Sequence, residues 1–192
     1  MLNPLLTLLE SSTEFTGLRD KVTAGEGTVE VTSIDAGISY AIAGLWSTLD
    51  VPVVVVTPAA DTARRLTDQL YTWVGDDAEV YQFSELEILP YERISPDSQA
   101  VNARIRALDA LHNRRPGESP LIVTSIAAAS QMVTPAAAFA NATHLLSVGD
   151  VIAMDTLVDR WVAMGYEMKA AVEAPGSASR RGGILDVYPP SL

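Results

Sequence analysis

Residues 32–39 have the spacing of a phosphate-binding loop but only part of its chemistry. Such a loop follows the pattern GxxxxGK[ST], in which glycines let backbone N–H groups cradle phosphates, a lysine neutralises charge and a hydroxyl holds magnesium. Gly37 and Ser39 fit this pattern, whereas Thr32 stands in place of the first glycine and Ile38 in place of the lysine. The two groups that matter most for phosphate charge and backbone approach are therefore missing.

Asp35 is a further argument against phosphate binding at this loop. Its carboxylate would lie inside the cradle, where two unit charges about 4 Å apart repel by roughly 1 to 4 kcal/mol. The sequence therefore predicts an ordinary strand-to-helix turn that binds no nucleotide. The alternative is an active helicase-like ATPase fragment that binds DNA and ATP through an unconventional loop.

The charge balance argues against a chain that binds nucleic acid as a whole. The sequence has 24 acidic and 13 basic residues, so its formal net charge is −11, and lysine occurs only as Lys21 and Lys169. Nucleic-acid-binding surfaces attract phosphates through clustered lysine and arginine. The 48% hydrophobic content is ordinary for a protein with a buried core.

No set of residues indicates a metal or catalytic site. Cysteine is absent, and His112 and His144 have no second ligand at metal-binding spacing. Glu85, Glu87 and Glu92 crowd one segment, but no base or nucleophile accompanies them. We predict no catalytic residue, no metal and no cofactor here. The N-terminus lacks a basic region and a long apolar run, which favours a cytoplasmic protein without a membrane segment.

The hydrophobic pattern predicts an α/β domain over residues 1–134. A short N-terminal helix at 4–10, continued at 18–22, precedes the expected strands at 29–32, 51–57, 79–83 and 121–124, which alternate with helices at 39–48, 61–73 and 96–113. This order is typical of three layers around a parallel sheet. The β-branched run at 51–57 predicts a strand buried on both faces.

Details of the predicted helices follow from caps and spacing. Asp61 and Ser95 are the expected N-caps, with Pro96 at the first helical position of the later helix. That helix is expected to turn Arg104 and Arg106 away from a buried stripe of Val101, Ile105, Leu108 and Leu111.

An alanine-rich stretch, TPAAAFANATH, marks the boundary to a small α+β domain at residues 135–192. We expect a strand at 145–148, a helix from a cap at Asp155 to a terminal glycine at Gly165, and strands at 166–172 and 183–188. Trp161 would pack that helix on the sheet, and residues 173–182 would form a polar hairpin loop. The final sheet is expected to be incomplete.

Three ordered motifs resemble known DNA-repair proteins. The segment TSIDAGISYAIAGLW resembles a decayed form of the phosphate-loop segment of UvrB. The segment FSELEILPYERISPDSQAVNARIRALDAL resembles a stretch of bacterial transcription-repair coupling factors. The segment GDVIAMDTLVDRWVAMGYEMKAAVEAPGSASRRGGILDVYPP is similar to the second domain that these factors share with UvrB. The long tyrosine-rich hairpin of UvrB is replaced here by a short loop after residue 83.

The resemblance implies the UvrB-like N-terminal module of a coupling factor, with a catalytically dead first domain and a second domain that recruits UvrA. In the family, ATP and Mg²⁺ act in a C-terminal motor that translocates on double-stranded DNA and displaces stalled RNA polymerase. A third possibility is a structural α/β domain whose resemblance to these proteins reflects common ancestry alone.

The resemblance also suggests the partner-binding residues. It implies that Arg181, with Arg180 beside it, lies on the face that meets UvrA. Where the family has a further interface arginine, this sequence has Glu167, with Lys169 close behind. Tyr188 could anchor a partner, although an aromatic residue at a strand end more often belongs to the core.

Overall fold

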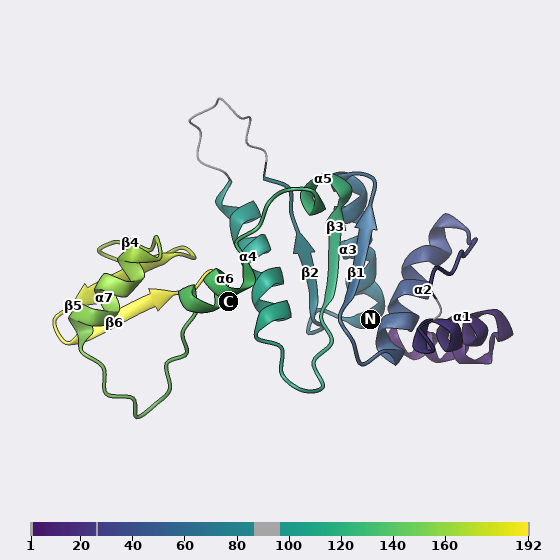
Figure 1. Ribbon diagram of the computed structural model, residues 1–192, viewed down its shortest axis with the longest axis horizontal. Coiled ribbons are helices and arrows are strands. Elements are labelled where there is room, and N and C mark those ends of the chain that lie inside the picture. The colour runs from purple at the N-terminus through teal and green to yellow at the C-terminus, as the bar shows by residue number, and fades with distance from the viewer. Residues whose placement is uncertain (1, 26, 87–96, 192) are drawn as a thin grey trace. The chain divides into compact units, whose positions relative to one another are not determined.

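The computed structural model describes residues 2–25, 27–86 and 97–191 (Figure 1). The chain divides into two compact units, unit 1 at Met1–Gln131 and unit 2 at Met132–Leu192. The sequence placed the boundary after residue 134, and each unit is described here by itself.

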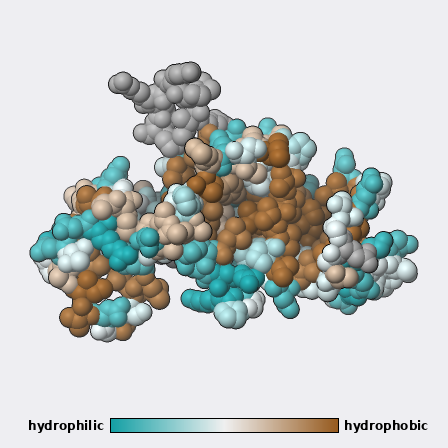
Figure 2. Space-filling model, viewed as in Figure 1, coloured by the Kyte–Doolittle hydropathy of each residue, from teal (hydrophilic) through white to brown (hydrophobic). Residues whose placement is uncertain are grey.

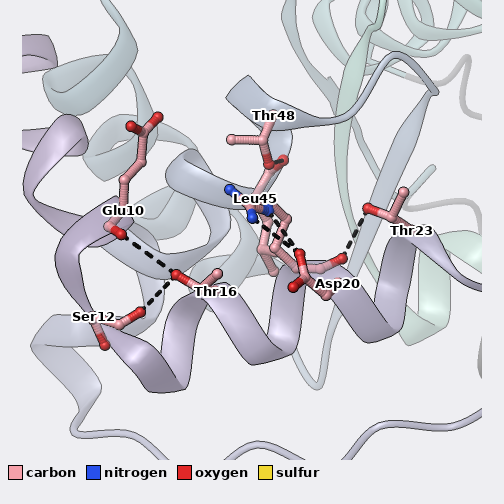
Figure 3. A network of polar contacts seen from close by, with 8 residues as sticks. Glu10, Ser12, Thr16, Asp20, Thr23, Leu45 and Thr48 are labelled. Carbon is pink, nitrogen blue, oxygen red and sulfur yellow. Dashed lines mark hydrogen bonds and ion pairs between the residues drawn. The ribbon is translucent and has the colours of Figure 1, made fainter.

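Unit 1 begins with helices that pack on one another. These are η1 (Asn3–Ser11, a 3-10 helix), α1 (Thr13–Thr23) and α2 (Asp35–Thr48). Ser12 caps α1 by accepting a hydrogen bond from the N–H of Phe15 at 3.3 Å. Figure 3 shows the Thr16 hydroxyl between Glu10 and Ser12, where it donates to the Ser12 carbonyl at 2.8 Å. These contacts fix the turn from η1 into α1.

The expected strand at 29–32 is not formed. These residues run without a sheet partner, and Val31 is exposed. They line a recess with Phe15 of α1 and Tyr40 of α2. A strand requires a neighbour that satisfies its backbone groups, and here the sheet begins only at the next segment.

The sheet of unit 1 is parallel and three-stranded, with the order β1-β3-β2. Its strands are β1 (Val53–Thr57), β2 (Val80–Phe83) and β3 (Leu121–Ser125), and its helices are α3 (Ala60–Val74), α4 (Ser98–His112) and α5 (Ile126–Ala129). Every residue of the central β3 is buried, as predicted for 121–124. Leu66 and Leu70 of α3 pack on this sheet and form the core with Val123. The predicted α/β class with a parallel sheet is confirmed.

The expectation that β1 is buried on both faces is wrong. Val54 and Val56 are 55% and 50% exposed, whereas Val53 and Val55 pack against the core. β1 is an edge strand, and α3 covers only the face to which Val53 and Val55 point. Figure 2 shows hydrophobic residues gathered where the sheet lies in Figure 1.

Two details of the predicted helix caps are corrected. Asp61 lies inside the first turn of α3, and Ala59 holds the cap position without a side-chain hydrogen bond. Asp97 caps α4 by accepting from the N–H of Gln99 at 3.2 Å, so the expected cap at Ser95 is wrong. Ser95 and Pro96 lie outside the described residues.

The predicted orientation of α4 is wrong at Arg104 and Leu111, whereas Arg106 is exposed as predicted. Arg104 is only 6% exposed, whereas Leu111, expected in the buried stripe, is exposed. The Arg104 guanidinium donates to the Ser84 carbonyl at 2.9 Å and lies 3.9 Å from the centre of the Phe83 ring. Because its polar head is satisfied there, its aliphatic stem can be buried.

Unit 2 contains a small mixed sheet with the order β4-β5-β6. Its elements are α6 (Ala136–Ala142), α7 (Met154–Ala163), β4 (Glu167–Met168), β5 (Ser177–Arg181) and β6 (Ile184–Tyr188). β4 pairs with β5 in parallel, and β5 pairs with β6 antiparallel. Trp161 of α7 is buried, and Gly165 follows the helix at φ +92°, as the predicted terminal glycine requires.

The structure corrects the predicted strands of unit 2. Residues 145–148 form no strand, and Leu145 is 87% exposed. The strand expected at 166–172 is reduced to Glu167–Met168, and Asp155 lies in the first turn of α7 behind the cap residue Ala153.

The segment predicted as a polar hairpin loop contains the central strand β5. Ser177 and Ser179 are buried, and their hydroxyls donate to the carbonyls of Ala174 and Ala170 at 2.5 and 3.1 Å. Buried hydroxyls are tolerated where they find such acceptors. The serines therefore belong to the core. Because they are polar, the sequence pattern predicted a loop for this segment.

Candidate functional site

The loop with phosphate-loop spacing is largely part of a helix. α2 begins at Asp35 and not at Ser39 as predicted, with Ile34 before it. Asp35 lies in the first turn, where a carboxylate is favourable beside the partly positive helix end. The N–H of Gly37 donates to the Ile34 carbonyl at 2.8 Å, which engages one of the groups that a phosphate would need.

The hydroxyl expected to hold magnesium in a working loop is turned into unit 1. Ser39 is 3% exposed, and its Oγ accepts a hydrogen bond from Nε1–H of Trp73 at 3.1 Å. A Cβ added to Gly37 would lie 2.7 Å from Oγ of Ser33, so the glycine permits close local packing. Ile38 and Thr32 are exposed.

A recess of about 490 Å³ lies beside this loop, between the beginnings of α2 and α3. Its charged lining residues are Asp35 and Arg65, while Ile38, Ile42 and Val55 make much of its wall aliphatic. A wall of this kind suits apolar groups better than phosphates.

The arginines predicted to bind a partner lie together in sequence but on opposite faces of the sheet in unit 2. Both belong to β5, where successive side chains alternate between faces. Arg180 pairs with Leu185 and Arg181 with Ile184 across the antiparallel ladder. Gly182, at φ +61°, and Gly183 form the two-residue connection that sets this register.

Each arginine is held by a carboxylate of its own face. Arg180 donates to Asp155 of α7 at 2.5 Å, so its face is the one that α7 covers. Arg181 donates to Asp186 of β6 at 2.6 Å on the other face. The Arg181 side chain is 69% exposed, which leaves most of its surface open to solvent.

Arg181 of β5 shares its face with three residues of β6. The ladder places Ile184, Asp186 and Tyr188 on the same face as Arg181, because each pairs with an alternate residue of β5. Ile184 is 60% exposed and Tyr188 37% exposed, so Tyr188 is not the core residue that strand ends usually provide. We call the set of Arg181, Ile184, Asp186 and Tyr188 the hairpin face.

Glu167 and Lys169 form a third charged pair at the edge of this sheet. Lys169 Nζ lies 2.8 Å from Glu167 Oε2. The hydrogen bond and the charge of Lys169 lower the pKa of Glu167, and the same contact raises the pKa of Lys169. Lys169 is therefore already engaged by the residue that stands where the resemblance implies an arginine.

Sequence reasoning missed the carboxylates that hold the arginines, Asp155 and Asp186. One signal was available, because a two-glycine turn between Arg181 and Ile184 fixes a register in which residue 186 lies diagonally across from residue 181. The polar residues of β5 predict a loop, and a loop has no such register. No such local signal exists for Asp155, which lies on α7.

A second missed cluster is centred on Gln131 at the end of unit 1. Its Oε1 accepts from Arg104 at 3.0 Å and from the N–H of Leu86 at 3.0 Å, and its Nε2 donates to the Leu86 carbonyl at 2.9 Å. The cluster ties α4, the segment after β2 and the segment after α5 together. Its hydrogen bonds serve to hold these three segments together.

His144 lies beside α7, where its Nε2 accepts from Nε1–H of Trp161 at 3.3 Å. Burial, together with the nearby charge of Arg160, lowers the pKa of His144. Across residues 2–25, 27–86 and 97–191, no three His, Cys, Asp or Glu side chains gather as a metal site. Within those same ranges, no helix has both the length and the apolar character to cross a bilayer.

Comparison with known proteins identifies relatives of the chain. Residues 145–192 match the family described as the UvrB interaction domain. The chain is 33% identical over 141 residues to the transcription-repair-coupling factor of Bacillus subtilis, an alignment that covers 72% of the chain and 11% of the relative.

Two other relatives align over nearly the whole chain. The transcription-repair-coupling factor of Myxococcus xanthus is 30% identical over 181 residues, or 92% of the chain and 15% of the relative. That of Staphylococcus aureus USA300 is 26% identical over 186 residues, or 96% of the chain and 15% of the relative. The chain thus spans only 11 to 15% of the length of these relatives. It belongs to the transcription-repair coupling factors and carries their UvrB interaction domain.

Proposed function

We propose that this chain is a non-catalytic UvrB-like module of a transcription-repair coupling factor and that its unit 2 recruits the excision-repair protein UvrA. The observation that carries the proposal is the exposed Arg181 on the hairpin face, within the residues that match the UvrB interaction domain. A planar guanidinium flanked by exposed apolar side chains is a common centre of protein interfaces.

The first part of the proposal is that unit 1 neither binds nor hydrolyses ATP. The support is chemical: Ile38 supplies no positive charge, Asp35 adds a negative one, and the hydroxyl of Ser39 is bonded to Trp73. In the longer relatives, ATP, Mg²⁺, double-stranded DNA and RNA polymerase would be engaged by other parts of the protein. The module contributes a docking site and no chemical step.

The ATP proposal is tested by titrating a fluorescent ATP analogue, with Mg²⁺, into the chain. We expect no saturable change at micromolar concentrations and no phosphate release. Saturable binding in that range would contradict the proposal and would favour the rival ATPase fragment.

The docking proposal is tested by calorimetric titration of the chain with purified UvrA. We expect binding that Arg181→Glu weakens by at least about tenfold, since a central interface arginine typically contributes more than about 1.4 kcal/mol. Arg64→Glu, an equal charge change at an exposed arginine of unit 1, is the matched control and should leave the affinity unchanged. Absence of binding by the folded native chain would refute UvrA recruitment.

A further inference from the structure

The hairpin face carries a carboxylate, Asp186, that competes with an acidic partner for Arg181. Asp186 Oδ2 lies 2.6 Å from Arg181 Nη2, and the two residues are diagonal neighbours across β5 and β6. An incoming carboxylate that approaches Arg181 therefore meets the negative charge of Asp186 beside it. On the opposite face, Asp155 holds Arg180 in the same way at 2.5 Å.

We propose that Asp186 lowers the affinity of Arg181 for an acidic segment of the partner and that Arg180 takes no part in this docking. The inference rests on the proposed recruitment function and adds which face docks and which residue restrains it. Docking exchanges the internal Arg181–Asp186 pair for a pair with the partner. Asp186 thereby lowers the affinity of the docked complex and favours its release.

The exposure of the pair makes this exchange feasible. The side chains of Arg181 and Asp186 are 69% and 39% exposed, so water and salt already weaken their attraction. Arginine carries five N–H donors in a planar fork. The hydrogen bond to Asp186 uses Nη2, so the other N–H groups of the guanidinium can donate to a partner carboxylate before the bond to Asp186 is released.

The exposed apolar side chains beside Arg181 favour docking at the hairpin face over docking at the α7 face. Ile184 and Tyr188 are 60% and 37% exposed on the hairpin face. A partner that covers them excludes water around Arg181 and strengthens the new ion pair. The Arg180–Asp155 pair is also exposed, at 45% and 80%, but it joins the sheet to α7 within unit 2.

The proposal is tested by titrating UvrA into the native chain and into two matched variants, Asp186→Asn and Asp155→Asn. Both changes remove one negative charge from a carboxylate that holds an arginine. We expect Asp186→Asn to bind about two- to five-fold more tightly, the effect of one exposed ion pair, and Asp155→Asn to bind as the native chain does. Unchanged or weaker binding by Asp186→Asn, or an equal gain in Asp155→Asn, would overturn the inference.

A second measurement separates this inference from the recruitment proposal and from misfolding. A polyglutamate peptide is titrated into each chain while the Arg181 Nε–H resonance is followed by NMR, and the backbone amide spectrum reports whether β5 and β6 remain folded. Asp186→Asn, or Asp186→Ser if the first variant unfolds, should shift the response of Arg181 to lower peptide concentration. An unshifted response overturns the inference, whereas failure of native UvrA binding with a shifted peptide response refutes only the recruitment proposal.

Discussion

The turn before α2 in unit 1 and the β5–β6 hairpin in unit 2 both contain residues whose types suggest binding, but they use them differently. Ser39 is buried and bonded to Trp73, so its hydroxyl is part of the packing of unit 1. Arg181 is bonded to Asp186 at the surface, so its charge remains exchangeable. Burial, more than residue type, therefore decides whether a polar group can bind a ligand.

The two units also differ in how their cores are distributed. In unit 1 the core extends over helices and strands, including Leu66, Leu70 and Val123. Among the described residues of unit 2, Trp161 and Ala178 are the buried hydrophobic side chains. Unit 2 should therefore depend on one residue far more strongly than unit 1 does.

Trp161→Ala is expected to have the largest effect on the stability of unit 2. Truncation of a buried tryptophan costs about 3 to 5 kcal/mol, so hydrogen exchange of the β5 and β6 amides should accelerate by about 10²- to 10³-fold or more. NMR or mass spectrometry can measure this exchange. Val162→Ala, at a neighbouring position that is 52% exposed, is the control and should change exchange little. Equal effects of both variants would contradict a core centred on Trp161.

Ser39→Ala sharpens the assignment of Ser39 to the packing of unit 1. The change leaves Nε1–H of the half-buried Trp73 without its acceptor. A fully buried unsatisfied donor costs about 1 to 3 kcal/mol, so we expect a loss at the lower end of that range. Urea unfolding followed by tryptophan fluorescence should show this loss. Ser33→Ala, at an exposed position of the same loop, should have an effect below about 0.5 kcal/mol. If Ser39→Ala is as stable as the native chain, the Ser39 hydroxyl has no structural role and is available to bind a ligand.

The smallest expected effect is a dependence of unit 2 on pH through His144. Burial lowers the folded-state pKa of His144 below its usual value of 6.5, so the unfolded chain binds a proton more readily. The resulting stability is present above pH of about 6.5 and is lost as pH falls toward the folded-state pKa. Exchange rates of the β5 and β6 amides, corrected for intrinsic pH dependence, should report this loss. His144→Asn should remove it, and a native chain that gains stability on acidification would show the wrong sign.

Several features could be predicted from the sequence because they depend on local patterns. The buried run at 121–124, the amphipathic helix around Leu66 and Leu70, and the glycine at 165 each follow from periodicity or from a required backbone conformation. The strand at 29–32 and the second buried face of β1 were predicted wrongly, because a strand pattern does not report whether a neighbour or a covering helix is present.

Three features can be established from the sequence: the departures from the phosphate-loop pattern at Thr32 and Ile38, the excess of acidic residues, and the motifs that relate the chain to the coupling factors. The folded structure was needed to show that Arg180 and Arg181 lie on opposite faces of the sheet and that Asp155 and Asp186 bind them. The central strand β5 buries Ser177 and Ser179, whose hydroxyls donate to the carbonyls of Ala174 and Ala170 in the segment before it. No hydrophobic periodicity marks such a strand, so its two faces become visible only once it is paired.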